Sequence, residues 1–511
     1  MQKISRRDLL KLSLTLPAFA ALSKFIPSPD ASEQNNNLPN IIIIVIDTMS
    51  AENLALYGYP RNTSPNLERF AERATVYHAH QSGGNFTVPG TASILTGTYP
   101  WTHRAINHAG LVTREFTEHN IFNMLPRSYR KLGFSQNLWA MHLLGQFNKH
   151  LNVLLPPTLF TESRHVFGDK FPKDLNAAYL SLDEFMFWHD DPTPSLIFGI
   201  PDRALLVYKD THANAAHPDY PLGIPSTGLL PINFRLNTLY DGIMSTLAGL
   251  ARESKSPYLS YIHLWGVHEP YKPHNRFDGS FKDSWIPAPK PQHPVGGKRS
   301  EEFLLRRRER YDEYIASTDF EFGRLLDFLE ENGILENSYV ILTADHGESL
   351  ERGTLGHTTP LLFQPLVHIP LIVLAPGQRE RLDVHSPTNS VDLLPTLASI
   401  TNQEVPDWCE GQPLPGINGL NTAAPRSSFT IEAKANSAFR PMSRYTMTIR
   451  RDNYKLIHYK DGAEYDFYEL YNLESDPEEL TNLYESLPAI AKPMQDELNT
   501  RSEMADRKYQ A

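Results

Sequence analysis

The chain has 511 residues, of which 41% are hydrophobic and 21% charged, and its net charge is −11 at pH 7. This length exceeds what one hydrophobic core usually holds, so we expect a large domain with a smaller companion. The negative charge argues against a nucleic-acid-binding protein, because such proteins usually present a basic surface. Cys409 is the only cysteine, which excludes a fold that depends on an intrachain disulfide.

The N-terminal segment has the features of an export signal. Residues 1–30 contain a charged start with Arg6 and Arg7, an apolar run, and small residues near Ala18. The pattern resembles the twin-arginine signals that move folded proteins, so we expect a periplasmic or extracellular protein. A short amphipathic start or a retained anchor is the alternative. Residues 31–38 predict a polar linker, and no later stretch is long and apolar enough to cross a bilayer.

The next segment places polar residues at the ends of a strand and a helix. Residues 40–46 are a continuous apolar, β-branched run, which predicts a strand buried on both faces of a mostly parallel sheet, and Asp47 follows it. Residues 89–96 start with proline and precede glycine, which predicts a helix. Thr87 lies at the mouth of this helix, where free backbone N–H groups favour an anion or a developing alkoxide. Thr87 is therefore a candidate nucleophile, and the alternative is a helix cap only.

The middle of the chain is less informative. It predicts helices over residues 126–132 and 234–251 and a strand over residues 205–208. A buried strand over residues 257–263 is followed by His268, which we expect at the catalytic edge of the sheet. His263 faces the core by strand alternation and is expected to be structural.

A long loop and a long helix come next. Residues 271–299 are rich in Pro, Gly and Lys, and such a loop is either a lid or specificity element or a surface excursion. Residues 306–310 predict a solvated helix face, and residues 311–332 predict a helix that packs on the sheet. Asp319 on this helix is expected at the surface.

A second buried strand, over residues 338–344, ends at Asp345 and His346. Ligands of open α/β sheets bind beyond the carboxyl ends of the strands, so we expect both residues near Asp47. Two carboxylates and an imidazole beside the Thr87 hydroxyl make a site for a divalent cation. Such a cation would lower the pKa of the hydroxyl and polarise a substrate oxygen.

These motifs, in this order, resemble the sulfatase branch of the alkaline phosphatase superfamily. The matching stretches are PNIIIIVIDTMSAENLALYGYPRNTSPNLERFAERATVYHAH, FTVPGTASILTGTYPWTHR, HLWGVHEP, VILTADHGESL, LGHTTPLLFQPLVHIPLIVLAPG and ELYNLESDPEELTNL. The resemblance implies an α/β fold with a large, mostly parallel sheet sandwiched by helices over residues 39–405. It also implies a smaller C-terminal α+β subdomain over residues 406–511, in which residues 444–460 predict a β-hairpin turning at Asp452.

The family resemblance also implies the chemistry, with one departure. Sulfatases convert a Cys or Ser into formylglycine, whereas this frame carries Thr87 and has Thr91 in place of the motif arginine. Superfamily branches with an unmodified Thr, such as lipoteichoic acid synthases and nucleotide pyrophosphatases, act on phosphate esters. We therefore predict a metal-dependent hydrolase of sulfuric or phosphoric esters, with phosphate favoured. The alternatives are a phosphoglycerol or phosphoethanolamine transferase and a non-catalytic protein that binds anionic esters.

The resemblance suggests further site residues. One divalent cation (calcium, manganese, magnesium or zinc) is expected, and its ligands would be Asp47, Thr87, Asp345 and His346. Three histidines stand where related enzymes bind substrate or transfer protons, namely His142, His268 and His357. His142 has a packed core residue as its alternative. The substrate would be a small-molecule, glycan or lipid-headgroup ester.

Overall fold

The structure is a computed structural model, and it describes residues 38–161, 194–213, 217–227, 232–253, 256–418 and 426–510. Between residues 162 and 193 it describes only residues 171, 174, 177, 178, 181 and 185. The export signal predicted over residues 1–30 lies outside the described residues, as does the predicted linker apart from Leu38.

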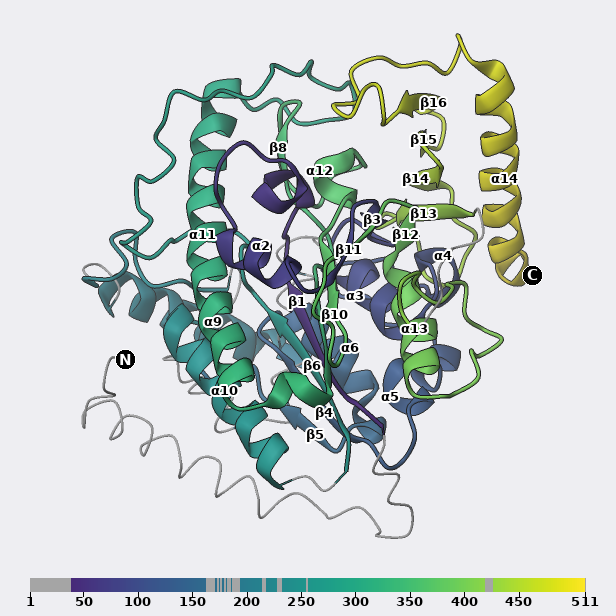
Figure 1. The fold of residues 1–511 in the computed structure, drawn as a ribbon. Coiled ribbons are helices and arrows are strands. Elements are labelled where there is room, and N and C mark those ends of the chain that lie inside the picture. The colour runs from purple at the N-terminus through teal and green to yellow at the C-terminus, as the bar shows by residue number, and fades with distance from the viewer. Residues whose placement is uncertain are drawn as a thin grey trace.

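The centre of the molecule is an eight-stranded sheet with the order β11-β2-β10-β7-β1-β6-β4-β5 (Figure 1). Five neighbouring strands, from β5 to β7 in that order, are parallel, whereas β10 is antiparallel to both β7 and β2. The strands of this sheet are β1 (Asn40–Ile46), β2 (Thr75–Tyr77), β4 (Arg130–Ser135), β5 (Val153–Leu155), β6 (Tyr258–Leu264), β7 (Ser338–Thr343), β10 (Leu371–Leu374) and β11 (Leu382–Val384). The predicted α/β class with a mostly parallel sheet is confirmed.

Helices cover both faces of this sheet, because alternate residues of β1 enter two separate cores. Ile42 and Ile44 pack with apolar residues of α2 (Pro65–Ala71), α10 (Leu236–Glu253) and α11 (Glu301–Glu331). Ile41 and Ile43 pack with α3 (Thr87–Thr96), α5 (Ile121–Met124), α6 (Leu138–Gln146) and α13 (Leu393–Ile400) on the opposite face (Figure 1). The continuous apolar run of β1 is thus explained by burial on both sides.

The C-terminal part forms a second, antiparallel sheet with the order β13-β14-β15-β16. Its elements are β13 (Ser427–Glu432), β14 (Arg444–Arg451), β15 (Tyr454–Asp461), β16 (Tyr465–Asn472) and the covering helix α14 (Pro488–Asp506). The predicted hairpin turn is confirmed between β14 and β15, where Asp452 has φ 51°. The smaller elements are β3 (His80–Gln81), β8 (Ser349–Glu351), β9 (Thr354–Gly356), β12 (Thr388–Asn389), α4 (Pro100–His103), α9 (Leu196–Ala213) and α12 (Gln364–Val367).

Two local predictions were wrong. No helix forms over residues 126–132: residues 126–129 make a turn, and residues 130–132 begin strand β4, which pairs with β6, distant in the sequence. The strand predicted over residues 205–208 lies inside helix α9. Short apolar runs do not distinguish a helix from a strand, so tertiary pairing decides.

The long helix also differs from expectation. α11 begins at Glu301, ten residues before the predicted start, and Ser300 caps it by accepting a hydrogen bond from Phe303 N. Arg308 is only 6% exposed and donates to the Leu350 carbonyl, so the predicted solvated face is wrong for this residue. Asp319 is also buried rather than at the surface, because its carboxylate accepts the backbone N–H groups that begin α2. Among the described residues, no helix combines the length and hydropathy needed to cross a membrane.

Candidate active site

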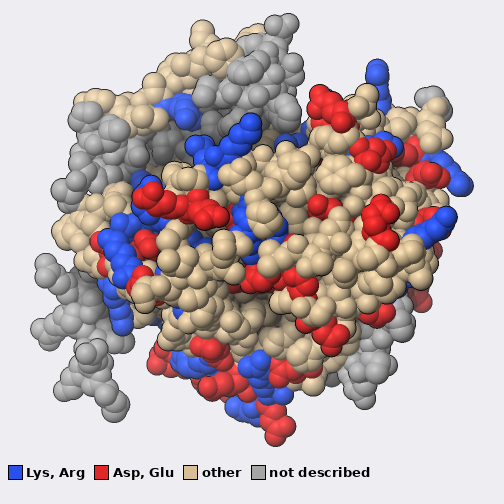
Figure 2. Space-filling view, turned by 90° about the horizontal axis from the view of Figure 1, so that it is seen from above, with Lys and Arg blue, Asp and Glu red and all other residues tan. Residues whose placement is uncertain are grey.

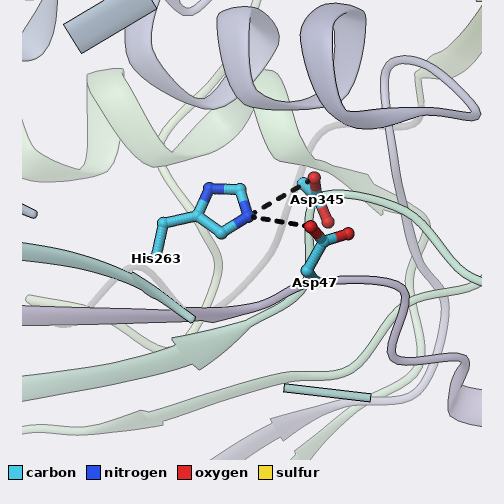
Figure 3. Close-up of side chains that lie close together, drawn as sticks. All are labelled: Asp47, His263 and Asp345. Atoms are coloured by element: carbon cyan, nitrogen blue, oxygen red, sulfur yellow. Dashed lines mark ion pairs between the residues drawn. The ribbon is translucent and has the colours of Figure 1, made fainter. Parts of the chain in front are cut away.

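The carboxyl ends of three adjacent strands bring together two carboxylates and a histidine. Asp47 follows β1 and Asp345 comes two residues after the end of its parallel neighbour β7, and both side chains are fully buried. His263 extends from β6, on the other side of β1, with Nε2 at 3.8 Å from Asp47 Oδ2 and 3.6 Å from Asp345 Oδ2 (Figure 3). His263 is buried as predicted, but its ring faces both carboxylates, so the expectation of a purely structural core residue overlooked this site.

Each carboxylate has one oxygen held by the protein and one without a partner. Asp345 Oδ1 accepts hydrogen bonds from His346 N (3.0 Å) and Thr48 N (3.4 Å), and Asp47 Oδ2 accepts one from Asn137 Nδ2 (2.6 Å). Asp47 Oδ1 and Asp345 Oδ2 have no hydrogen-bond partner in the part of the chain that the structure describes. Buried carboxylate oxygens without partners are energetically costly, so a positive charge bound between these two would be stabilised.

His346 directs the lone pair of its Nε2 toward the two unpartnered carboxylate oxygens. Its Nδ1 lies 2.9 Å from the Gly347 carbonyl, so Nδ1 donates and Nε2 is the unprotonated nitrogen. Nε2 lies 3.4 Å from Asp47 Oδ1 and 3.5 Å from Asp345 Oδ2. Burial, together with the charge of His357, holds the pKa of His346 well below its usual range, so the ring is neutral.

The two carboxylates affect each other's ionisation. Burial and the nearby Asp47 charge raise the pKa of Asp345 well above its usual value. Although burial opposes it, the surrounding histidines lower the pKa of Asp47. A divalent cation would relieve the repulsion between the carboxylates and fill the orphaned coordination positions. The buried Asp47, His263 and Asp345 therefore fit a cation, as is typical of the family to which the sequence points.

Thr87 reaches this group from the start of α3. The helix begins at Thr87, two residues earlier than predicted, and Phe86 occupies the N-cap position without a side-chain cap. The alternative of Thr87 as a cap only is therefore wrong. Thr87 Oγ1 lies 3.5 Å from His346 Nε2. The structure thus brings the four predicted ligands, Asp47, Thr87, Asp345 and His346, together.

The close approach of α3 to Asp345 explains this placement. A Cβ atom at Gly90 would overlap the carbonyl oxygen of Asp345, so only glycine lets the helix approach so closely. The Ser82 hydroxyl also lies within hydrogen-bonding reach of the same carbonyl. These contacts hold the start of α3 against the end of β7.

Two of the three predicted histidines adjoin the cluster. The His357 ring lies 4.5 Å from that of His346 and 4.8 Å from that of His268, between ring centroids. His357 Nδ1 is 3.3 Å from Oε1 of the buried Glu348, and although burial opposes it, this charge raises the pKa of His357. His268 Nδ1 donates to the Glu269 carbonyl (2.6 Å), and burial lowers the pKa of His268. Because Nδ1 of each ring has a protein partner, Nε2 is the nitrogen that can exchange a proton with a substrate.

His142 has different surroundings. It lies on α6 with its ring 5.7 Å from the Trp139 ring, and it is not part of the group formed by Asp47, His263 and Asp345. This placement favours the packed-residue alternative over a role in the reaction.

The sequence prediction missed two residues besides His263. Asn137 comes two residues after the end of β4 and bonds both Asp47 and Thr87, but the wrong helix prediction over residues 126–132 hid this strand end. An Asn that precedes an apolar helical run is a capping signal that would have pointed to it. Glu348 lies two residues after His346, and its acidic side chain was available in the sequence.

The rim of the site is built partly by the C-terminal subdomain. Asn85 Nδ2 donates to the carbonyls of His357 and Thr359, both at 2.8 Å. Lys434, just after β13, donates to the Thr358 carbonyl at 3.1 Å. The loop that carries His357 is therefore held from both sides. On the face seen in Figure 2, side chains of both charges are interspersed.

The long loop over residues 271–299 is tied down along its path. Arg61 forms an ion pair with Asp283 (2.7 Å), and Lys290 forms one with Glu351 (2.7 Å). His293 Nε2 lies 3.1 Å from Glu469 of the C-terminal sheet. These contacts fix the loop between the main domain and β16.

Comparisons with known proteins match most of this chain. The Sulfatase family profile matches residues 39–152 and 208–403, and a profile described as N-sulphoglucosamine sulphohydrolase, C-terminal, matches residues 358–505. Choline-sulfatase of Rhizobium meliloti (strain 1021) is 23% identical over 481 residues, covering 88% of this chain and 83% of that protein.

Solved structures share the fold. Phosphonate monoester hydrolase of Agrobacterium radiobacter has a TM-score of 0.65 and 18% identity, covering 91% of this chain and 96% of that one. A protein in complex with its substrate D-glucosamine-2-N,6-O-disulfate has a TM-score of 0.63 and 16% identity, covering 92% and 99%. Because the family profile matches more than half of the sequence, this chain belongs to the sulfatase family and is an ester hydrolase of that superfamily.

Proposed function

We propose that this protein is a metal-dependent hydrolase of sulfuric or phosphoric esters that uses the unmodified Thr87 hydroxyl as its nucleophile. The observation that carries the proposal is the convergence of two orphaned carboxylate oxygens with Thr87 Oγ1 and His346 Nε2. All these groups are buried, and they meet at the mouth of a helix that no side chain caps.

The residues divide into cation-holding and substrate-facing groups. Asp47, Asp345, His346 and Thr87 would hold the cation, and His263 Nε2 is a further candidate ligand. When bound, a divalent cation supplies positive charge that offsets the ester anion and lowers the pKa of a hydroxyl. The backbone N–H groups at the start of α3 face the same space and favour anionic ester oxygens.

The chain's own groups account for the proton and bond changes. The Thr87 hydroxyl gives its proton to solvent, and its Oγ forms a bond to phosphorus or sulfur while the bond to the leaving oxygen breaks. The leaving alcohol takes a proton from Nε2 of His357, and the neutral His268 beside it can accept a proton from the attacking water. Water then attacks the Thr87 ester, and its oxygen is retained in the released anion. The raised pKa of His357 favours its protonated form and suits it to the acid role.

An unmodified threonine suits phosphate better than sulfate. A phosphothreonine can be opened by water at phosphorus, whereas formylglycine expels sulfate by elimination from a geminal diol. Proteins similar to this chain carry names for phosphorus and for sulfur substrates, namely a phosphonate monoester hydrolase and a choline-sulfatase. The signal-like pattern of residues 1–30 supports action outside the cytoplasm, which we include in the proposal.

Mass spectrometry of the intact protein and its peptides tests the nucleophile. Metal-replete protein would be exposed briefly to a p-nitrophenyl phosphate diester, a phosphate monoester and a sulfate, while nitrophenol release is followed. We expect a phosphoryl adduct on Thr87 that Thr87→Val, which keeps the shape, abolishes and Thr87→Ser partly retains. An adduct that persists in Thr87→Val, or bound cation without adduct or turnover, would contradict the proposal. The second result would favour a binding protein.

A further inference from the structure

Asn137 connects three elements of the site through one side chain. It is 1% exposed, lies just after β4 and forms the N-cap of α6, where its Oδ1 accepts the Trp139 N–H at 2.9 Å. Its Nδ2 donates to Asp47 Oδ2 at 2.6 Å and to Thr87 Oγ1 at 3.0 Å. One amide thus bonds both the carboxylate after β1 and the hydroxyl at the start of α3.

The orientation of this amide follows from its partners. A backbone N–H only donates, so the Asn137 atom that faces Trp139 must be the oxygen. The nitrogen then faces Asp47, and a carboxylate is the acceptor that such a nitrogen requires. Both N–H bonds of the amide therefore point into the site.

These bonds affect the two atoms most concerned with the reaction. Because Asn137 engages Asp47 Oδ2, the carboxylate presents its orphaned Oδ1 to the cation position. Because Thr87 Oγ1 accepts an N–H, its own hydrogen must point elsewhere, and His346 Nε2 lies 3.5 Å away. The N–H of Asn137 also stabilises Thr87 Oγ1 in the deprotonated form that attacks.

We infer that Asn137 is a positioning residue that orients Asp47 toward the cation and holds Thr87 Oγ1 for attack. The Thr87 half rests on the proposed function, whereas the Asp47 half concerns cation binding alone. Partners of metal ligands commonly change metal affinity or activity by about 10- to 100-fold when removed.

A matched control separates this role from simple helix capping. Asn120 is fully buried and caps α5 with the same chemistry, since its Oδ1 accepts the N–H groups of Phe122 and Asn123. Its Nδ2 donates to the Thr117 carbonyl, so the whole side chain serves local structure. Serine is a good N-cap but is too short to reproduce both bonds of Asn137.

The experiment compares Asn137→Ser and Asn120→Ser with the wild type in Mn²⁺ titration calorimetry, thermal melting and single-turnover adduct formation. For Asn137→Ser we expect a Mn²⁺ dissociation constant raised about 10-fold and a kcat at saturating Mn²⁺ lowered about 10- to 100-fold. KM should change less than about threefold, because the chemical step depends on Thr87 orientation. Asn120→Ser should change only the melting temperature.

Each other result decides a part of the inference. If both variants change only the melting temperature, Asn137 is a cap and the inference is overturned. If Mn²⁺ binding weakens but kcat at saturation is unchanged, the Thr87 half is overturned. If the wild type forms no adduct while Asn137→Ser still weakens Mn²⁺ binding, the proposed function fails and the Asp47 half stands.

A second variant keeps the test decisive if Asn137→Ser does not fold. Asn137→Asp retains an N-cap oxygen but loses both N–H donors. We expect kcat at saturating Mn²⁺ to fall about 10-fold or more, without weaker Mn²⁺ binding, because the new carboxylate attracts the cation. Wild-type kcat in this variant would overturn the Thr87 half.

Discussion

Two regions of this molecule bury charged side chains, and they do so in opposite ways. In the C-terminal sheet, Nζ of Lys455 on β15 lies 2.7 Å from Glu479 Oε1, and both side chains are almost completely buried. The other oxygen of Glu479 accepts the Gln364 N–H at 2.7 Å, so this carboxylate is satisfied. At the edge of the main sheet, by contrast, Asp47 Oδ1 and Asp345 Oδ2 have no partner among the described residues.

This difference indicates that the Lys455–Glu479 pair has a structural role, whereas Asp47 and Asp345 have a functional one. A buried ion pair with satisfied hydrogen bonds contributes to a unique packing and needs nothing further. A pair of buried carboxylates without a cation is unfavourable by itself and becomes favourable only when one binds. Substitutions in the two regions should therefore have opposite consequences for activity and stability.

The largest effect is expected for Asp345→Asn. The asparagine oxygen still accepts the two backbone N–H groups that Asp345 Oδ1 accepts, but the cation loses a charged ligand. Ester hydrolysis should fall at least about 10⁴-fold, or about 5 kcal/mol in kcat/KM. In EDTA the variant should melt at the wild-type temperature or higher, because a neutral amide avoids both the burial cost and the repulsion from Asp47 that raise the pKa of Asp345. A melting temperature in EDTA below that of the wild type would show that repulsion between Asp47 and Asp345 does not destabilise the cation-free protein.

Lys455→Met should lower the stability of the protein and leave its activity nearly unchanged. It leaves Glu479 buried without its cation, which costs about 3–5 kcal/mol of unfolding free energy. Urea unfolding measures this loss, and kcat measured where the variant is folded should stay within about twofold of the wild type. Adding Glu479→Gln, which retains an acceptor for Gln364, should recover part of the stability. No recovery in the double variant would mean that the ion pair is not the cause.

A smaller effect compares two histidines. His268→Asn should lower kcat by about 10²-fold, because the ring adjoins His357 beside the cluster and its Nε2 is a candidate proton acceptor. His142→Asn should change kcat less than about threefold, because this ring packs against Trp139 on α6. Steady-state rates at saturating cation, with melting temperatures as the folding control, measure both. Equal losses in the two variants would restore His142 as a reaction residue.

The last prediction concerns the pH dependence of stability, which two buried and neutral histidines, His80 and His103, should produce. Burial lowers the pKa of both His80 and His103 from 6.5 to about 3. The unfolded chain binds these protons near pH 6.5, whereas the folded protein does not until about pH 3. Their stabilising contribution is therefore fully present above pH 6.5 and is lost as the pH falls toward 3. Each histidine changes the unfolding free energy by about 1.4 kcal/mol per pH unit in that window.

His103→Asn tests this pH dependence. The asparagine oxygen can replace His103 Nδ1 as the acceptor of the Ala105 N–H, but it cannot titrate. Urea unfolding in EDTA between pH 4 and pH 6 should show a slope smaller by about 1.4 kcal/mol per pH unit than in the wild type. An unchanged slope would mean that His103 is protonated in the folded state or does not titrate in this range.

Much of the framework could be predicted from short-range patterns. The β-branched runs before Asp47 and Asp345 predicted two buried strands, and the parallel-sheet rule placed both residues at one edge. The proline and glycine around residues 89–96 located the helix that carries Thr87 to within two residues. The Asp452 turn was equally local.

Other features depended on contacts between distant segments. β4 formed where a helix was predicted, because its pairing with β6 outweighs the weak local preference of a short run. Asn137 follows β4 and His263 lies in β6, so their meeting with Asp47 depended on the strand order.

The sequence by itself therefore determined the elements whose signals lie within a few residues: the buried strands, the start of α3, and Asp47, Thr87, Asp345 and His346 as candidates. Only the tertiary structure decided that Asn137 and His263 join them and that Asp319 and Arg308 are buried. The physical reason is that burial and charge compensation depend on what surrounds a side chain in space, and most of those neighbours lie far away along the chain.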